Sequence, residues 1–530
     1  MEFINRQLIS VFKSKFFPIS TYKKMELLHI PDFSVFFSFL LFIFILLCMR
    51  RKKLENHNSN PPPGPWKFPL IGNIPQLVGA LPHHRFRDLA KKYGPVMSIQ
   101  LGQVPSVVIS SAQTAKEVLK THDVQFAGRP IILAAKIVYY NRMDIVFSEY
   151  GDYWRQMRKI CTLELLSAKR VQSFRPVREQ EVSNFVDFLI SKSGTSVNLT
   201  KTIFALTNSI MARTVIGKTY GDQQALLSVI DGASEAASGY SIADVFPSFK
   251  FLHYVTGEYS KLIRLHKKTD KVLEEIISEN KANRKCGDHH HGEIENLLDV
   301  LLKLQESGNL QVPLTNAGIK GALLEMFGAG SDTSSKTIEW AMAELMRHPT
   351  EMRKVQEEVR RVFRSTGKVE ESRLDELEYL KLVIKETLRI HPPGALVPRE
   401  CTETTSIGGY DIHPKTKVVV NVWAINRDPS IWTEPEKFWP ERFRNNPINY
   451  HGTHFELIPF GAGKRICPGI TLATINLELF LANLLYHFDW KFPDGITAET
   501  LDMTDVLGGT IRRKVDLELV PIPHFPLSAN

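Results

Sequence analysis

The chain has 530 residues, 43% of them hydrophobic, so it can bury a large core and is not disordered throughout. Its formal net charge of +9 favours an acidic partner or an anionic membrane surface, and nucleic acid is not an expected partner because the basic residues are spread along the chain without a nucleic-acid-binding motif. The five cysteines, at positions 48, 161, 286, 401 and 467, form no C-x-x-C pair, which argues against a disulfide framework and fits a reducing compartment.

The N-terminal part contains an apolar run from Phe33 to Met49. A bilayer needs about 17 to 25 such residues, so we predict a transmembrane anchor over residues 30–50, with a buried core helix as the alternative. The four cations at positions 50–53 keep the rest of the chain cytosolic by the positive-inside rule. Further cations in residues 1–24 remove this contrast, whereas a start at Met25 restores it. We therefore interpret residues 1–24 as an extension of doubtful origin, with a transit peptide as the alternative.

Residues 51–65 form a basic and proline-rich hinge, because the prolines at 61–63 and 65 favour extended polyproline geometry. The main domain is expected over residues 66–530. Residues 96–102 and 106–110 are rich in β-branched residues and predict a hairpin, whereas most of the remaining chain predicts helix.

Trp154 and Arg158 lie four residues apart on one face of a predicted helix. A cation and an indole so placed could hold a propionate, and a surface cation packed on tryptophan is the alternative. A longer helix is predicted from about Leu314 to Arg347. Its glycines at 328 and 330 each cost up to about 1 kcal/mol relative to alanine, which predicts a functional kink or a widened turn. Asp332 and Thr333 follow directly, and an ordinary intrahelical hydrogen bond is the simplest interpretation of that pair taken alone.

Glu386 and Arg389 can form an ion pair on a helix, and the stretch P-E-R-F at 440–443 supplies a second arginine, Arg442. Residues 460–469 then place Cys467 among glycines, a proline and two cations, Lys464 and Arg465. The cations and the start of a helix just beyond would stabilise a thiolate, and the glycines permit positive φ. Such a thiolate can be a nucleophile or an iron ligand, and a tight turn around an inert buried cysteine is the alternative.

The spacing F-x-x-G-x-R-x-C-x-G resembles the haem-binding loop of the cytochrome P-450 superfamily of haem-thiolate monooxygenases. The stretches A-G-S-D-T-S, E-x-x-R, P-E-R-F and W-x-x-x-R resemble its other motifs, so that the similarity extends from Pro61 to Ile522. It implies a mainly α fold with a small β subdomain, a single large domain behind an N-terminal membrane anchor, and a place in the endoplasmic reticulum membrane. The stretches at 126–130 and 458–463 resemble plant A-type microsomal members.

The resemblance also implies roles for individual residues. Cys467 would be the axial thiolate ligand of a haem b iron, and Asp332 and Thr333 would be catalytic, because they would deliver protons for cleavage of dioxygen. Arg399 and Arg465 would bind haem propionates, and a network of Glu386, Arg389 and Arg442 would fix the ligand loop. The residues expected to bind the cofactor are Cys467, Arg465, Phe460, Gly463, Trp154, Arg158 and Arg399.

Four stretches that line the substrate pocket in this family, at 131–135, 326–327, 394–397 and 506–509, contain no charged residue, which favours a hydrocarbon-like substrate. The overall pattern is most similar to terpenoid oxidases, and we predict hydroxylation, with repeated turnover to a ketone, of a casbene-type diterpene. Sesquiterpene, alkaloid and phenolic substrates stay open.

Electrons would come through NADPH-cytochrome P-450 reductase, because no G-x-G-x-x-G nucleotide site is evident. The resemblance implies that the basic stretch 155–178 is the docking face, with a merely solvated face as the alternative for any single residue in it. The alternatives from other classes are a haem-thiolate isomerase or dehydratase that does not use O2, and a non-enzymatic haem sensor or carrier.

Overall fold

The computed structural model describes residues 38–39, 42–43, 59–237, 241–285 and 295–524. The predicted extension 1–24, nearly all of the predicted anchor 30–50 and most of the hinge 51–65 lie outside the described residues. In the described part, one helix is long and apolar enough to cross a membrane, namely α20 (Ile470–His487), but 61% of that stretch is buried inside the fold. We therefore treat α20 as a core helix.

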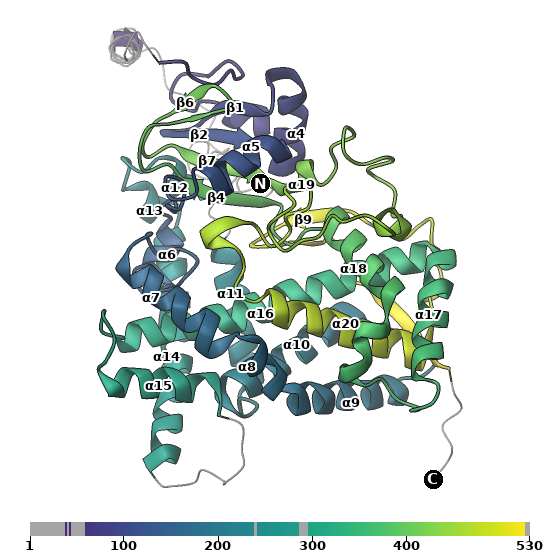
Figure 1. Ribbon diagram of the computed structural model, residues 1–530. Helices are drawn as coiled ribbons and strands as arrows, with labels where there is room; N and C mark the ends of the chain where they lie inside the picture. The colour runs from purple at the N-terminus through teal and green to yellow at the C-terminus, as the bar shows by residue number, and fades with distance from the viewer. Residues whose placement is uncertain (1–37, 40–41, 44–58, 238–240, 286–294, 525–530) are drawn as a thin grey trace, which may run out of the picture.

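Helices form the larger part of the molecule, and a smaller strand-rich region lies beside them (Figure 1). This arrangement agrees with the predicted fold class. The helices are α3 (Ile74–Leu77), α4 (Pro82–Tyr93), α5 (Ala112–Lys116), η2 (Glu117–Thr121), α6 (Leu133–Ile137), α7 (Asp152–Ile160), η3 (Cys161–Leu165), α8 (Ala168–Ser173), α9 (Arg175–Ser191), α10 (Leu199–Ile216), α11 (Gln223–Ala236), α12 (Ile242–Val245), α13 (Leu252–Val255), α14 (Glu258–Lys285), α15 (Leu297–Ser307), α16 (Asn316–Arg347), α17 (Pro349–Phe363), η4 (Glu371–Glu376), α18 (Glu378–Ile390), α19 (Val422–Ile425), η5 (Pro440–Phe443), η6 (Gly463–Arg465) and α20.

The main sheet has the strand order β1-β2-β7-β4. Its first two strands form the hairpin predicted from the sequence, with Val96 opposite Ile109. Pro105 is tolerated in the central strand β2 because pairing with β7 begins only at Ser106, so the missing amide hydrogen breaks no bond to β7. The strands are β1 (Val96–Leu101), β2 (Val104–Ile109), β3 (Val197–Asn198), β4 (Leu396–Glu400), β5 (Thr405–Ile407), β6 (Tyr410–Ile412), β7 (Lys417–Asn421), β8 (Phe488–Lys491), β9 (Asp505–Leu507), β10 (Ile511–Arg513) and β11 (Glu518–Pro523).

Helix α16 passes through the middle of the helical region and packs against α10, α11, α18 and α20 (Figure 1). It is α-helical throughout, so the widened turn predicted at its glycines is not present. Close packing explains Gly330 instead, because a Cβ there would lie 2.6 Å from the Met211 sulfur on α10. Its start at Asn316 and its end at Arg347 agree with the predicted helix within two residues.

Candidate active site

The loop that carries Cys467 lies between η6 and α20. The Cys467 amide donates to the Phe460 carbonyl oxygen at 2.9 Å, which closes the loop. Gly461 and Gly463 have φ values of +71° and +70°, so the predicted need for glycine is met at both positions. At Gly463 a Cβ would lie 2.0 Å from the carbonyl oxygen of Leu119, in the middle of η2. The loop is therefore fixed against a neighbouring π-helical turn as well as by its own hydrogen bonds.

The electrostatic surroundings of Cys467 differ from the prediction. Burial raises the pKa of the Cys467 thiol, and the Gly469 amide and the Arg158 guanidinium act against this rise. Arg158 on α7 is the cation that favours the thiolate. Lys464 is exposed, and Arg465 is turned toward backbone carbonyls, so the two cations next to the cysteine in sequence do not have the predicted role.

Arg465 is held by backbone oxygens on three sides. Its Nε, Nη1 and Nη2 atoms donate to the carbonyls of Ala127, Ile145 and Ser148 at 2.7, 3.1 and 2.6 Å. Its guanidinium carbon lies 4.6 Å from the centre of the Trp154 ring. The Trp154 Nε1 donates to the same Ile145 oxygen at 3.0 Å. The structure thus brings Trp154 to the ligand loop, but its indole N–H is already hydrogen-bonded to the Ile145 carbonyl oxygen.

Three guanidinium groups gather beside this loop, from Arg129, Arg399 and Arg465. Arg399 is 1% exposed, and its pKa is held well below the usual value by burial and by repulsion from the other two arginines. Burial likewise lowers the pKa of Arg129 to about 10 and of Arg465 to about 9. Arg129 and Arg399 both donate to the Pro398 carbonyl oxygen, and the buried Arg129 Nε has no partner among the described residues.

A buried cluster of like charges is costly unless an anion joins it. Asp123 and Asp144 relieve the repulsion among these arginines only in part, and two further carboxylates between them would offset more of it and accept the Nε–H of Arg129. The residues present therefore fit the two propionates of a haem whose iron is bound by the nearby cysteine. Arg129 was missed by the sequence reasoning, although it belongs to the quoted stretch 126–130.

On α16, Thr333 is half-buried and its Oγ1 donates to the Ala329 carbonyl oxygen at 2.7 Å, the intrahelical bond expected of the pair taken alone. Asp332 is buried and accepts hydrogen bonds from two hydroxyl groups outside the helix, those of Ser234 and Thr510. No sequence motif pointed to these two donors.

The structure brings Glu386, Arg389 and Arg442 into one buried network. Both carboxylate oxygens of Glu386 accept from Arg389, at 2.8 and 2.9 Å, and one also accepts from Arg442 Nε at 2.9 Å. The Trp439 amide donates to the same oxygen at 2.9 Å. The remaining guanidinium N–H groups donate to backbone carbonyls, among them that of Asn426. This network locks α18 to the segment that precedes the ligand loop.

The basic stretch 155–178 is only in part a surface. Arg155, Lys159 and Lys169 are exposed, but Arg178 is completely buried. Its Nε and Nη2 atoms bind the two carboxylate oxygens of Glu371 at 2.7 and 2.6 Å. Arg178 is therefore removed from the predicted docking face.

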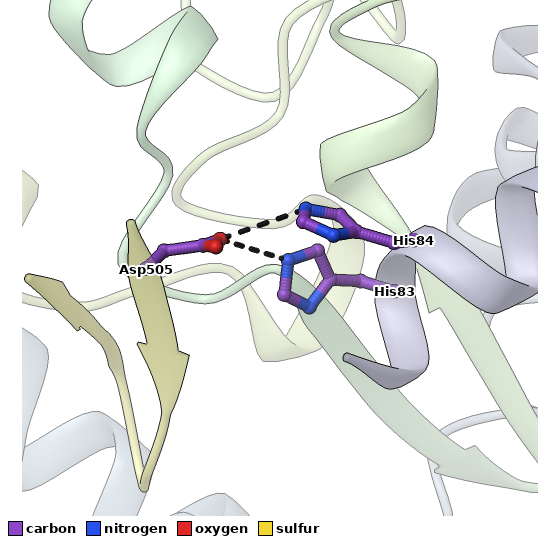
Figure 2. A group of neighbouring side chains, drawn as sticks. All are labelled: His83, His84 and Asp505. Atoms are coloured by element: carbon purple, nitrogen blue, oxygen red, sulfur yellow. Dashed lines mark hydrogen bonds and ion pairs between the residues drawn. The ribbon is translucent and has the colours of Figure 1, made fainter. Parts of the chain in front are cut away.

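His83 and His84 on α4 point toward Asp505 on β9 (Figure 2), and the three could hold a metal ion. Their Nε2 atoms lie 3.2 and 3.6 Å from one Asp505 oxygen. Two features favour a hydrogen-bonded clamp instead. The other ring nitrogen of His83 is buried without a partner among the described residues, whereas a metal-bound histidine usually donates from it. In addition, the Arg427 guanidinium lies 4.0 Å from the centre of the Trp423 ring against which His84 packs. A positive charge therefore already lies close to the two histidines, which disfavours a metal cation there.

The sequence profile of the family Cytochrome P-450 matches residues 61–517. The chain is 66% identical over 499 residues to cytochrome P-450 726A27 of Euphorbia lathyris, a match that covers 94% of this chain and 99% of that protein. The chain belongs to the cytochrome P-450 family.

Further relatives of this cytochrome P-450 support the family assignment and the fold. It is 50% identical over 497 residues to premnaspirodiene oxygenase of Hyoscyamus muticus, covering 93% of this chain and 99% of that one. A zebrafish cytochrome P-450 solved with abiraterone superposes with a TM-score of 0.71 at 26% identity, covering 84% of this chain and 100% of that chain. The predicted family, fold, enzyme class and haem cofactor with axial cysteine thiolate are therefore confirmed. Cytochrome P-450 monooxygenases take electrons from a redox partner and act on small hydrophobic substrates with O2. Besides premnaspirodiene oxygenase, the relatives include 5-epiaristolochene 1,3-dihydroxylase of Nicotiana tabacum, 48% identical over 499 residues, so relatives of this chain act on terpenoids.

Proposed function

We propose that this cytochrome P-450 is a terpenoid hydroxylase of the endoplasmic reticulum membrane, with Cys467 as the iron ligand and a cytosolic catalytic domain that receives electrons from NADPH through NADPH-cytochrome P-450 reductase. The observation that carries the assignment of the site is the cationic cluster of Arg129, Arg399 and Arg465 beside the Cys467 loop. A buried set of three guanidinium groups, one of whose Nε–H groups has no partner within the described residues, favours a further anionic group at this place.

In the proposed site, haem bound through Cys467 supplies the activation of dioxygen and the insertion of one oxygen atom into a substrate C–H bond. Arg129, Arg399 and Arg465 hold its propionates. Burial raises the pKa of the Cys467 thiol, and the Arg158 guanidinium and the Gly469 amide oppose this rise only in part, so binding to iron would be needed to hold the sulfur as a thiolate.

Two residues on α16 carry the proposed proton delivery. The Asp332 carboxylate takes a proton from solvent and passes it on, and Thr333 Oγ1 leaves the Ala329 carbonyl to donate toward the dioxygen site. Glu386, Arg389 and Arg442 act on structure alone, because they are buried in a network that is complete within the chain.

The substrate class is proposed from the apolar lining. Met326 and Phe327 on α16 are buried in one apolar cluster with Ile132 and Ala135. In a second apolar cluster, Ile511 packs with Ala395 and Leu396 of the 394–397 stretch. Such surroundings favour a hydrocarbon over a charged or sugar substrate. A casbene-type diterpene is our specific proposal, with oxidation at one carbon continuing to a ketone on repeated turnover.

The test is expression with a plant reductase, followed by incubation with NADPH, O2 and either casbene or premnaspirodiene, with products identified by mass spectrometry. We expect hydroxylated casbene that requires both NADPH and reductase, and no product from Cys467→Ala. Oxidation of premnaspirodiene alone would retain terpenoid hydroxylation and reject the diterpene. A product formed without NADPH would reject the monooxygenase and support an isomerase or dehydratase.

A further inference from the structure

The Asp332 carboxylate accepts hydrogen bonds from hydroxyl groups on two elements that lie far from α16 in the sequence. Thr510, in the turn between β9 and β10, donates from Oγ1 to Asp332 Oδ2 at 2.6 Å. Ser234, on α11, donates from Oγ to the same oxygen at 3.3 Å. The short bond has the length of a charge-assisted O–H···O⁻ hydrogen bond, whereas the longer one is weaker. Thr510 is therefore the main restraint on this side chain.

The shape of the β9–β10 turn brings Thr510 to this position. The Gly508 amide donates to the Thr510 carbonyl oxygen at 3.0 Å and closes the turn. The Ile511 amide donates to the Pro393 carbonyl oxygen at 2.9 Å. At Gly509 a Cβ would lie 2.3 Å from the Ser234 carbonyl oxygen, so a side chain there would push the turn away from α11. The turn thus needs glycine at 509 for the Thr510 hydroxyl to reach α16.

The other end of this hairpin is also fixed. Asp505, the first residue of β9, is the residue held by His83 and His84 of α4 (Figure 2). The hairpin is consequently clamped at its base to the strand-rich region and at its tip to the central helix. A hydroxyl group at a tip held in this way has little freedom to leave its acceptor.

We propose that Thr510 is a positioning residue for proton delivery, which holds Asp332 in one rotamer through Oδ2 and leaves Oδ1 to exchange protons. This inference rests on the proposed function of Asp332. Productive turnover consumes O2, two electrons and two protons and gives hydroxylated product and water, whereas the same electrons and protons without O–O cleavage give hydrogen peroxide. A carboxylate that rotates freely delivers protons less often, so peroxide should increase at the expense of product.

The test compares Thr510→Val, which keeps the shape but removes the hydroxyl, with Thr510→Ser, which restores it. The matched control is Thr504→Val, which removes the hydrogen bond between the hydroxyl of the exposed Thr504, just before β9, and the Asp502 carboxylate. The assay contains plant reductase, NADPH and whichever of casbene and premnaspirodiene the wild type oxidises. We expect Thr510→Val to lower the amount of product per NADPH about tenfold, which corresponds to the free energy of one hydrogen bond to a charged group. Thr510→Ser and Thr504→Val should resemble the wild type.

A second readout does not depend on activity. Hydrogen exchange measured by mass spectrometry should speed up across residues 505–513 in Thr510→Val and not in Thr504→Val, while the reduced carbonyl spectrum stays that of the wild type. Unchanged exchange together with unchanged coupling would overturn the inference. If neither terpene is oxidised, the ratio of peroxide to water formed from O2 and the exchange rates still decide, since they need no substrate.

A double-mutant cycle separates this inference from the function on which it rests. If Thr510 acts through Asp332, Thr510→Val should add nothing in an Asp332→Asn background. Equal fold-losses in both backgrounds would reject the positioning role. An Asp332→Asn variant with full coupling would reject the proposed function of Asp332 itself, whereas an impaired Asp332→Asn beside an unimpaired Thr510→Val would reject only the inference on Thr510.

Discussion

Replacing Glu386 by glutamine tests the network that supports the ligand loop. The Glu386 carboxylate accepts two hydrogen bonds from Arg389, one from Arg442 and one from the Trp439 amide, all between 2.8 and 2.9 Å. The side chains of Glu386 and Arg389 are fully buried, and that of Arg442 is 5% exposed. Glutamine keeps the size but loses the charge, and its amide group presents a donor to two guanidinium groups. Two positive charges would then face each other without a counter-ion.

Removing one partner of a buried ion pair costs about 3–5 kcal/mol, because the other charge is left uncompensated. Folded domains have only about 5–15 kcal/mol in total, so the loss is a large share. For a chain of this size we expect the melting temperature to fall by roughly 5 °C. Haem content should fall as well, measured as absorbance of the reduced carbonyl adduct per mole of protein, because the segment that precedes the Cys467 loop is attached through this network.

Glu376→Gln is the matched control, since Glu376 also pairs with an arginine three residues away, Arg373, but at the surface, with 49% and 28% of the side chains exposed. Solvent screens that pair, so neither melting nor haem content should change measurably. A Glu386→Gln protein that melts with the wild type and retains its haem would show that the buried carboxylate is dispensable, and the reasoning would fail.

Three further outcomes follow from the site. Gly463→Ala should abolish most haem binding, because its Cβ would overlap the Leu119 oxygen at 2.0 Å, whereas Gly495→Ala, with φ of +83° and open space around it, should lose only a little stability in thermal melts. Arg399→Met should speed transfer of haem to apomyoglobin, since it removes a guanidinium from the cationic cluster; an unchanged rate would contradict the propionate assignment. Burial lowers the pKa of His84 from 6.5 to about 4, so the unfolded chain binds a proton below pH 6.5 that the folded chain does not, and the melting temperature should fall between pH 6.5 and 4, with a flatter curve in His84→Gln.

Sequence reasoning succeeded where the chemistry is local. The hairpin of β1 and β2 was predicted from two runs rich in β-branched residues, and the long helix α16 from the helical run at 314–347. The Cys467 loop was found from the spacing F-x-x-G-x-R-x-C-x-G, and its glycines at 461 and 463 do have positive φ. In each case the physical requirement acts within about ten residues, so it leaves a pattern in the sequence.

Contacts between distant segments left no such pattern. Lys464 and Arg465 adjoin Cys467 in the chain, yet Arg158 of α7 is the cation that acts on its sulfur. The widened turn predicted in α16 was wrong because Gly330 is needed for packing against Met211 rather than for backbone freedom. Side-chain direction and helix contacts decide both cases, and neither can be read from spacing along the chain.

Two buried arginine clusters differ in what balances their positive charge. Arg389 and Arg442 share the Glu386 carboxylate and donate their remaining N–H groups to carbonyls, so the chain balances this cluster by itself. Arg399 and its two neighbours repel one another and donate to backbone oxygens, and the attraction of Asp123 still leaves the pKa of Arg399 well below its usual value, so an external anion would stabilise this cluster further. A ligand that binds the folded state alone stabilises it in proportion to its affinity. We therefore expect haem binding to be coupled to folding through the cationic cluster, whereas the Glu386 network is complete within the part of the chain that the structure describes.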